Sequence, residues 1–327
     1  MTIVVSVQHP VAAWTVPESA VARLRAACPD HEVINATTDE ERAAGLARSD
    51  VAFTWRLSPE ELHGAPRLRW LHSSAVAVGT LCLDALAARG VVVSNSRSIQ
   101  STPIAEHVFA LLLAMTRQLP LAIQKQQQAA WAQNAFVGAH TPSVLRGRCL
   151  AVIGLGSIGA EVARLGAAFG MEVIGLRRDP SRGTPPGVSH VFGPTDLDTL
   201  LARADVVVIA APLTADTEAL LDASRLARLK PGARLVNVAR GQLLDADALI
   251  AALASGHLAG AALDVFPDEP LPAAHPLWRA PSVLLTPHTS GFRADHWNDV
   301  VDLFAENIRR WDAGDPVLWS VDPARGY

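Results

Sequence analysis

Residues 150–178 constrain the fold of this chain more than any other stretch, and they read LAVIGLGSIGAEVARLGAAFGMEVIGLRR. A short apolar run leads into the glycine pattern Gly154-x-Gly156-x-x-Gly159, and helix-spaced apolar residues and a second apolar run follow it. This order predicts a strand, a tight turn, a helix and another strand. The first glycine permits the turn, the second lets a pyrophosphate approach the backbone, and the third lets the helix pack closely on its strand. We therefore expect a dinucleotide to bind at the helix N-terminus.

The residues after the second strand indicate which dinucleotide the turn prefers. A carboxylate about 20 residues beyond the glycines binds the adenosine ribose of NAD, whereas an arginine accommodates the 2′-phosphate of NADP. Arg177 and Arg178 occupy this position. Because a guanidinium binds a phosphate in a bidentate manner, we expect NADP(H). In the alternative, both arginines are solvated surface residues, Asp179 binds the ribose, and NAD(H) is the cofactor.

Length and composition exclude several classes of protein. A chain of 327 residues, half of them hydrophobic, predicts two domains with separate cores. The formal net charge is −4 and no basic run is present, so we expect neither nucleic acid nor a membrane surface as a partner. The N-terminal apolar run is too short for a signal peptide, which favours a cytoplasmic protein. Cys28, Cys82 and Cys149 lack metal-ligand spacing, so we expect them to be reduced and buried, and we expect no metal site.

Two series of strands, each alternating with helices, lie on either side of Thr102-Pro103. This pattern predicts two parallel sheets covered by helices on both faces. The strands are expected at residues 3–7, 33–34, 51–54, 68–71 and 91–94 in the first series, and at 150–153, 171–176, 206–210, 235–238, 260–265 and 283–286 in the second. Thr102 is expected to cap, and Pro103 to begin, a long helix that runs to about Arg117 and is closed by Pro120.

The expected domains are unequal and one of them is discontinuous. A final helix from Arg293 to about Trp311 is predicted to pack on the first series of strands. The first domain then contains residues 1–101 and 292–327, and the dinucleotide-binding domain contains residues 102–291. Within the latter, residues 119–146 are rich in glutamine and alanine. They are predicted to be either an arm that packs on a second subunit or an ordinary solvated helix and loop.

Three polar residues, Arg240, Glu269 and His288, follow successive strands of the second series. The carboxyl ends of parallel strands share one edge of the sheet, where ligands bind. Singly, each residue has an ordinary explanation: a surface ion pair, a solvated acid and a helix cap. Together they suit the reduction of a 2-oxo acid, which needs a guanidinium for the carboxylate and carbonyl, an acid to protonate the oxygen, and a carboxylate to favour charged histidine.

Six motifs occur in a fixed order along nearly the whole chain. They are Ile104-Ala-Glu-His-Val108, Gly154-Leu-Gly-Ser-Ile-Gly159, Pro212-Leu-Thr-Ala-Asp-Thr217, Asn237-Val-Ala-Arg-Gly241, Leu263-Asp-Val-Phe-Pro-Asp-Glu-Pro270 and Pro287-His-Thr-Ser-Gly291. With these motifs the chain resembles the D-isomer-specific 2-hydroxyacid dehydrogenase family. The resemblance implies two Rossmann-like/flavodoxin-like domains with doubly wound parallel sheets, an active site in the interdomain cleft, and a homodimer joined through the cofactor domain and its arm.

The resemblance also implies roles for individual residues. Arg240 is expected to anchor the substrate, Glu269 to pair with the histidine, and His288 to donate or accept the proton. Asp264 is expected to bind the nicotinamide carboxamide. The other residues expected to contact the cofactor are Thr102, Gly154, Gly156, Ser157, Ile158, Gly159, Arg177, Arg178, Pro212, Thr217 and Val238.

The loop after residues 68–71 departs from the family pattern. Family members commonly have an Ala-Gly-Val turn whose backbone N–H groups hold the substrate carboxylate, whereas this chain reads Ser74-Ala75-Val76-Ala77-Val78-Gly79. The Cβ of Ala77 restricts dihedral angles that glycine allows, so the identity of the substrate stays open although Val76 and Ala77 are still expected to bind it. Arg177 is a second departure, since many NAD-dependent members have aspartate there.

Arg56, after residues 51–54, is expected either to contact the substrate carboxylate or to be a surface arginine beside Glu60 and Glu61. His107, His72 and Arg293 are less favoured candidates. The sequence thus predicts an NADPH-preferring reductase of small 2-oxo acids, with glyoxylate and hydroxypyruvate as the leading substrates and D-2-hydroxy acids as products. Two alternatives stay open: an NAD-dependent D-2-hydroxyacid dehydrogenase with another substrate, and a dinucleotide-sensing binding protein similar to the corepressors that share these motifs.

Overall fold

The computed structural model describes residues 1–323 and 326 and divides into two compact units. One unit contains residues 1–100 and the described residues from 292 onward, and the other contains residues 101–291. Each unit is built on a parallel β-sheet with helices packed against it. The predicted fold class, α/β with two parallel sheets, is confirmed.

The first unit has a five-stranded sheet in the order β2-β1-β3-β4-β5, and all of its strand pairs are parallel. The strands are β1 (Thr2–Ser6), β2 (Glu32–Asn35), β3 (Val51–Thr54), β4 (Trp70–Ser73) and β5 (Val92–Asn95). β3 and β4 are buried along their whole length. A strand covered on both faces has no solvent side, which is why neither shows the polar alternation of a half-exposed strand.

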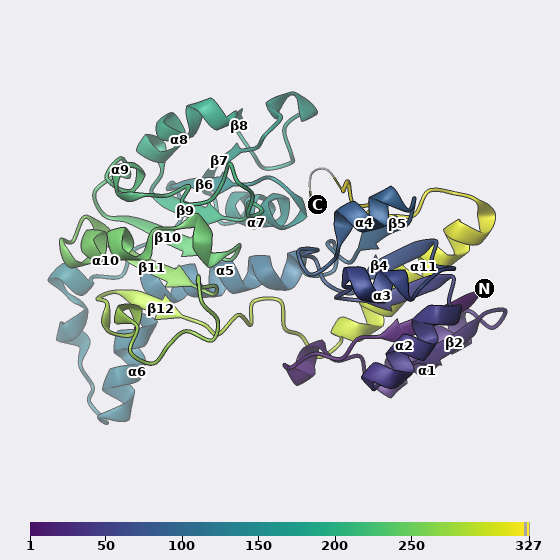
Figure 1. Ribbon diagram of the computed structural model, residues 1–327. Coiled ribbons are helices and arrows are strands. Elements are labelled where there is room, and N and C mark those ends of the chain that lie inside the picture. The colour runs from purple at the N-terminus through teal and green to yellow at the C-terminus, as the bar shows by residue number, and fades with distance from the viewer. Residues whose placement is uncertain (324–325, 327) are drawn as a thin grey trace. The chain divides into compact units, whose positions relative to one another are not determined.

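In the part of this unit that the structure describes, α-helices pack on the sheet. They are α1 (Glu18–Ala27), α2 (Asp39–Arg48), α3 (Pro59–His63), α4 (Leu83–Ala88) and α11 (His296–Ala313). Side chains of α1 and α11 form the core on one face with Trp70 and Phe304, and those of α2, α3 and α4 form the core on the other. Figure 1 shows the yellow helix α11 among the purple and blue elements of this unit, to which it belongs despite its distance in the sequence.

The second unit has a seven-stranded sheet in the order β12-β11-β10-β9-β6-β7-β8, again with parallel pairs only. The strands are β6 (Cys149–Ile153), β7 (Glu172–Leu176), β8 (His190–Phe192), β9 (Val206–Ile209), β10 (Ala233–Asn237), β11 (Leu258–Leu263) and β12 (Val283–Leu285). The chain adds β7 and β8 on one side of β6 and then returns to add β9 on the other. In open α/β sheets, ligands bind beyond the strand ends where the order reverses in this way.

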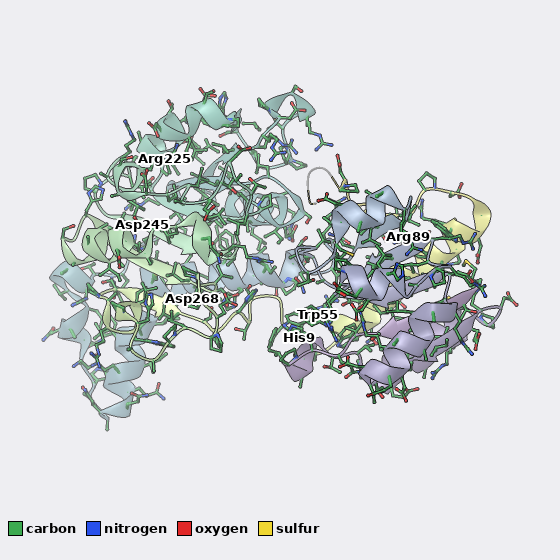
Figure 2. The ribbon with its side chains drawn as sticks, viewed as in Figure 1. His9, Trp55, Arg89, Arg225, Asp245 and Asp268 are labelled. Atoms are coloured by element: carbon green, nitrogen blue, oxygen red, sulfur yellow. The ribbon has the colours of Figure 1, made fainter. Side chains whose placement is uncertain are left out.

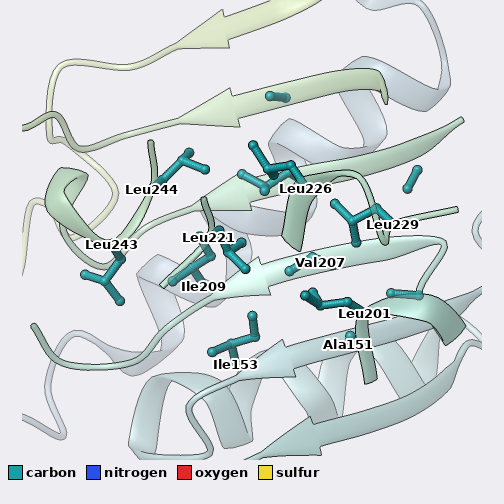
Figure 3. Close-up of a cluster of buried hydrophobic side chains, with 14 of the residues drawn as sticks. Ala151, Ile153, Leu201, Val207, Ile209, Leu221, Leu226, Leu229, Leu243 and Leu244 are labelled. Atoms are coloured by element: carbon teal, nitrogen blue, oxygen red, sulfur yellow. The ribbon is translucent and has the colours of Figure 1, made fainter. Parts of the chain in front are cut away.

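Helices cover both faces of this sheet as well. They are α5 (Ser101–Thr116), α7 (Ser157–Ala168), α8 (Leu197–Arg203), α9 (Ala223–Leu226) and α10 (Ala246–Ala254). The helix that follows α5, α6 (Leu119–Gln127), has no buried residue and lies away from the sheet (Figure 1). α5 and α7 contribute to the core on one face, and α8, α9 and α10 to the core on the other. Figure 3 shows the second of these cores, in which Ile153 and Ile209 of the strands face Leu201 and Leu226 of the helices.

The chain around Thr102 differs from the prediction. α5 begins at Ser101, so the N-cap predicted for Thr102 is wrong, although Pro103 does lie in the first turn, where its missing N–H breaks no helical hydrogen bond. Pro120 does not close this helix. Instead α5 ends at Thr116, Gln118 adopts a φ of 57°, and Pro120 lies in the first turn of α6. Proline suits a helix start as well as a helix end, which is why its sequence signal was misread.

Residues 119–146 contain α6 and two short 3₁₀ turns, and their exposed apolar side chains include Ile123 and Trp131. Cys28 and Cys149 are buried free thiols as predicted, but Cys82 is only half-buried because it lies at the solvent-facing start of α4. Among the residues that the structure describes, no helix is both long enough and apolar enough to cross a membrane.

Candidate active site

The glycine turn joins β6 to α7, and each of its glycines meets a different steric demand. Gly154 has a φ of 98°, and a Cβ there would lie 2.6 Å from the backbone of Ala211. A Cβ on Gly159 would lie 1.8 Å from the carbonyl oxygen of Gly154, so α7 packs directly on the turn. Gly156 is exposed, and a Cβ there would have open space around it. The start of α7 is therefore accessible to an anionic ligand such as a pyrophosphate.

Arg177, directly after β7, lies beside this turn. Its guanidinium donates hydrogen bonds to the carbonyl oxygens of Leu155 at 3.3 Å and Gly183 at 3.0 Å. Asp179, which would bind the ribose in the NAD alternative, accepts hydrogen bonds from the hydroxyl and the backbone N–H of Ser181, and these bonds lower its pKa. The guanidinium of Arg177 thus lies next to the glycine turn, while the carboxylate of Asp179 is hydrogen-bonded within its own loop.

Arg240 lies in a turn that the buried side chain of Asn237 closes. Asn237 Nδ2 donates to the carbonyl oxygen of Arg240 at 2.9 Å, and Oδ1 accepts a backbone N–H of the same turn at 3.0 Å. A Cβ on Gly241 would lie 2.0 Å from the carbonyl carbon of Phe266, so the turns after β10 and β11 meet backbone to backbone. Burial lowers the pKa of Arg240, and the negative charge of Glu269 opposes this shift. The guanidinium therefore stays charged at neutral pH.

Glu269 and His288 form a hydrogen-bonded pair across the neighbouring ends of β11 and β12. Glu269 Oε2 lies 2.7 Å from His288 Nδ1, and Oε1 accepts the N–H of Phe266 at 2.9 Å, so both carboxylate oxygens are fixed. Asp268, on the same loop, is labelled in Figure 2. The side chain of His288 is 45% exposed. Because Nδ1 is bound to the carboxylate, Nε2 is the ring nitrogen that is left to exchange a proton with a ligand.

Asp264 is fully buried and organises the loop that carries His288. Its carboxylate accepts hydrogen bonds from the hydroxyl of Thr286 at 2.6 Å and from the N–H groups of Thr289 at 2.9 Å and Ser290 at 3.0 Å. Its backbone carbonyl accepts the N–H of His288 at 2.9 Å. His288 has a φ of 53°, a conformation that a histidine rarely adopts and that these contacts hold in place. The predicted contact of Asp264 with the nicotinamide carboxamide stays a prediction.

The loop of residues 74–79 follows β4 in the first unit. Within residues 1–323 and 326, the backbone N–H groups of Val76 and Ala77 donate to no acceptor, and Ala77 is exposed. Ala77 is not among the residues with positive φ, so its Cβ fits the conformation of this loop. Two free N–H groups at the end of a strand are able to bind a carboxylate.

Arg56 follows β3, and its guanidinium lies near carboxylates of the same unit. It donates to Asp39 at 3.1 Å and lies 3.8 Å from Glu61, and its side chain is 44% exposed. The buried Arg42 pairs with Glu61 at 2.5 Å and donates to the carbonyl oxygen of Arg56 at 2.6 Å. This geometry agrees with the surface-arginine alternative, and the contact of Arg56 with a substrate stays a prediction.

The remaining predicted residues lie after strands or at the starts of helices of the second unit. Ser157 and Ile158 are in the first turn of α7, Pro212 and Thr217 are in the loop after β9, Val238 is buried after β10, and Thr102 and Arg178 are exposed. His9 and Trp55, which follow β1 and β3 and were not among the predicted residues, lie side by side in Figure 2 with ring centroids 4.7 Å apart.

Two less favoured candidates make internal contacts. His107 Nε2 lies 3.0 Å from the hydroxyl of Thr286, and Arg293 forms ion pairs with Asp295 and Asp299. No three His, Cys, Asp or Glu side chains of the described residues gather in a way that holds a metal ion.

Comparison with known proteins accounts for this arrangement. A family model described as D-isomer specific 2-hydroxyacid dehydrogenase, NAD binding domain, matches residues 109–290, which include the glycine turn and the Arg240, Glu269 and His288 loops. The chain therefore belongs to the D-isomer-specific 2-hydroxyacid dehydrogenase family. The matched segment is its nicotinamide dinucleotide-binding domain.

Individual relatives match most of the chain. It is 35% identical over 300 residues to D-3-phosphoglycerate dehydrogenase from Mycobacterium tuberculosis, covering 91% of this chain and 54% of that protein. The chain thus spans about half the length of the first curated relatives it matches. It is 30% identical over 304 residues to glyoxylate reductase from Thermofilum pendens, covering 90% of this chain and 88% of that protein. A solved D-isomer specific 2-hydroxyacid dehydrogenase from Xanthobacter autotrophicus, in complex with NADPH and MES, is 34% identical with a TM-score of 0.82, covering 100% of this chain and 99% of that one.

Proposed function

We propose that this protein is an NADPH-preferring oxidoreductase that reduces small 2-oxo acids to D-2-hydroxy acids, with glyoxylate and hydroxypyruvate as the leading substrates. The observation that carries the proposal is the His288–Glu269 pair at 2.7 Å, on loops that follow neighbouring strands and adjoin the turn of Arg240. A cation, a proton donor and a carboxylate that orients the donor are the groups this reaction needs.

Each of the three residues has a separate task in the reaction. Arg240, which remains charged although partly buried, binds the substrate carboxylate and draws electron density toward the carbonyl oxygen. When bound, a reduced nicotinamide supplies hydride to the carbonyl carbon. His288 donates the proton of Nε2 to the carbonyl oxygen and becomes neutral, while Glu269 holds Nδ1–H and stabilises the charged ring before the transfer. The product is the 2-hydroxy acid.

The preference for NADPH rests on Arg177. Its guanidinium lies beside the glycine turn, whereas Asp179 is engaged by Ser181. Arg177→Asp should therefore weaken NADPH binding by about 10-fold or more and change NADH binding much less, because a charge-assisted contact with the 2′-phosphate is replaced by repulsion. Fluorescence titration with both dinucleotides measures the two dissociation constants. Equal losses for NADPH and NADH would refute the 2′-phosphate role.

The backbone N–H groups of Val76 and Ala77, which donate to no acceptor among the described residues, are proposed to bind the substrate carboxylate. A homodimer is also proposed, and it is supported by the several apolar side chains that residues 119–146 expose together, since an accumulation of exposed apolar residues is typical of an interface: Leu119, Ile123, Trp131, Val137 and Val144. Light scattering of the purified protein tests the dimer, and a monomer at micromolar concentration contradicts it.

A second candidate function is supported by the relatives named D-3-phosphoglycerate dehydrogenase, of which the chain spans about half the length. In that case the physiological reaction is the NAD-dependent oxidation of a 2-hydroxy acid that carries a phosphate, and the same three residues work in the opposite direction.

One spectrophotometric experiment separates the candidates. Purified protein is mixed with NADPH or NADH and with glyoxylate, hydroxypyruvate, pyruvate, an aryl 2-oxo acid or 3-phosphooxypyruvate, and the loss of reduced-nicotinamide absorbance is followed. Turnover of glyoxylate or hydroxypyruvate with NADPH preferred supports the proposal, whereas preference for the phosphorylated acid with NADH supports the second candidate. Tight dinucleotide binding without turnover of any acid contradicts both and favours a dinucleotide-sensing protein.

A further inference from the structure

A chain of buried hydrogen bonds in the first unit runs from β4 and β5 into the loop of residues 74–79. Trp70 Nε1 donates to Ser94 Oγ at 2.9 Å, and Ser94 Oγ lies 2.7 Å from His72 Nδ1. On the other side of the ring, His72 Nε2 lies 3.2 Å from Ser96 Oγ, which donates to the carbonyl oxygen of Ser73 at 3.0 Å. All five residues are fully or almost fully buried, so no water competes for these groups.

The two ends of this hydrogen-bond network favour one direction for every bond in it. The indole N–H of Trp70 donates and the carbonyl of Ser73 accepts. Every hydrogen of the network then has an acceptor when Ser94 donates to His72 Nδ1, His72 Nε2 donates to Ser96, and Ser96 donates to Ser73. His72 is therefore neutral and carries its hydrogen on Nε2. In the opposite tautomer, the hydroxyl hydrogen of Ser94 loses its acceptor, and Ser96 has to turn from Ser73 toward the ring.

The surroundings keep the ring of His72 neutral and immobile. Its side chain stacks on Phe304 with ring centroids 5.1 Å apart and an interplanar angle of 22°, and Phe53 lies on the sheet beside it at 5.8 Å. Burial lowers the pKa of His72 to about 3, so the ring is uncharged at neutral pH. The hydrogen-bond network around His72 is therefore not interrupted by protonation of the ring near pH 7, and the packed ring is held in one orientation.

Ser73 connects the hydrogen-bond network of His72 to the loop of residues 74–79. Its carbonyl is held by Ser96, and its hydroxyl accepts the N–H of Ala75 at 3.2 Å. Three residues after Ser73, the carbonyl of Val76 accepts a hydrogen bond from Asn95 Nδ2 at 2.8 Å. The Ser73 carbonyl, which precedes the N–H of Val76, is therefore anchored to the segment that follows β5, and the Val76 carbonyl, which follows that N–H, is anchored to β5 itself.

We propose that His72 is a positioning residue for substrate binding: through Ser96 it holds the Ser73 carbonyl and so aims the N–H groups of Val76 and Ala77 at the carboxylate of the 2-oxo acid. The inference rests on the proposed function, in which this loop binds that carboxylate. A neutral histidine suits this role because one ring nitrogen accepts a hydrogen bond and the other donates one. The ring thereby connects Ser94, which is bonded to Trp70 in the core, to Ser96, which is bonded to the loop.

Two substitutions of His72 separate positioning from simple core support. In His72→Gln, the amide nitrogen lies as many bonds from Cα as Nε2 does, so it retains the donor for Ser96. In His72→Asn, the amide lies as far from Cα as Nδ1, so the link toward Ser96 is lost. Both replacements leave a space beside Phe304, and both should lower the unfolding temperature to a similar extent.

The measured quantities are kcat and KM for glyoxylate or the best acid of the panel, KM for NADPH, and the inhibition constant of oxamate, an unreactive mimic of a 2-oxo acid. His72→Asn should raise the acid KM and the oxamate constant about 3- to 10-fold, the equivalent of one hydrogen bond, with kcat and the NADPH KM within about twofold of wild type. His72→Gln should restore most of the acid KM. Ser96→Ala, which leaves the aromatic packing intact, should reproduce the effect of His72→Asn.

Unchanged acid KM and oxamate constants in Ser96→Ala would overturn the inference, as would equal constants for the Gln and Asn variants in the presence of equal losses of thermal stability. In either case the network supports only the core. The wild-type protein distinguishes this failure from failure of the proposed function, since an enzyme that turns over no 2-oxo acid refutes the function itself before any variant is compared.

Discussion

Two glycines of the same turn should respond to alanine in opposite ways. A Cβ on Gly159 would lie 1.8 Å from the carbonyl oxygen of Gly154 and 2.9 Å from its carbonyl carbon, whereas ordinary van der Waals contact begins at 3.4 Å. On Gly156, by contrast, the same Cβ meets nothing within 4 Å, and its φ of −79° is open to any residue. The first change should therefore damage the fold, and the second should damage only the binding of a ligand.

The size of each effect follows from this geometry. Gly to Ala inside a helix normally stabilises by about 1 kcal/mol. At Gly159 the methyl group meets backbone that no side-chain rotation can move away, so α7 must shift by more than about 1 Å relative to the turn. Overpacking of this kind costs about 1–3 kcal/mol or more, which outweighs the gain in helix propensity. Gly156→Ala should change stability by less than about 0.5 kcal/mol, the usual range for an exposed substitution.

Thermal unfolding without ligand and fluorescence titration with NADPH test both statements. Gly159→Ala should unfold several degrees below wild type. Gly156→Ala should unfold like wild type but bind NADPH at least about 10-fold more weakly, because its methyl group would occupy the space of the pyrophosphate. A Gly156→Ala variant with normal stability and normal NADPH affinity would refute the assignment of this turn to the dinucleotide.

Three further predictions concern the catalytic loops and the response to pH. His288→Ala should lower kcat by roughly 10²–10⁴-fold and leave NADPH affinity nearly unchanged, and near-normal turnover would exclude it as the proton donor. Gly241→Ala, whose Cβ would lie 2.0 Å from the carbonyl carbon of Phe266, should force the Arg240 turn away from the Glu269 loop and lower kcat/KM; unchanged kinetics would contradict that coupling. Burial lowers the pKa of His296 to about 4 and that of His72 to about 3. Since the unfolded value is 6.5, the unfolded chain binds more protons below that pH, so the stability is complete above pH 6.5 and should fall by about 1.4 kcal/mol per pH unit for each histidine down to about pH 4. Urea unfolding at pH 7.5 and 5 measures this loss, and equal stabilities would contradict it.

Most of the fold was predictable because buried strands of a parallel sheet are continuous apolar runs. β8 was missed because it has only three residues, it begins with the exposed His190, and it lies at the edge of its sheet, where one side has no neighbouring strand to bury it. Proline misled the prediction at residue 120 because the same ring geometry suits the first turn of α6 and the residues after α5.

The proximity of the Arg240, Glu269 and His288 loops was predictable from topology, since residues that follow adjacent parallel strands must emerge at one edge. The network of His72 was not predictable, because it depends on the register of β4 and β5. His72 pairs with Ser94 across the two strands, and a shift of one residue would turn these side chains to opposite faces. The hydrogen bonds that the Asp264 carboxylate accepts could not be predicted either. Two of its three donors are backbone N–H groups, which occur in every sequence and leave no pattern.

The backbone contacts around Arg240 and His288 have a consequence for redesign of this protein. Gly241 lies against the main chain of Phe266, and the N–H of Phe266 donates a hydrogen bond to Glu269. The carboxylate of Asp264 accepts hydrogen bonds from main-chain N–H groups beside His288. Main-chain contacts, together with the side chains of Asn237 and Asp264, therefore set the spacing of Arg240, Glu269 and His288. If the proposed function holds, a library that seeks new acids is best confined to residues 74–79 of the first unit, because substitutions there leave these contacts of the second unit unchanged.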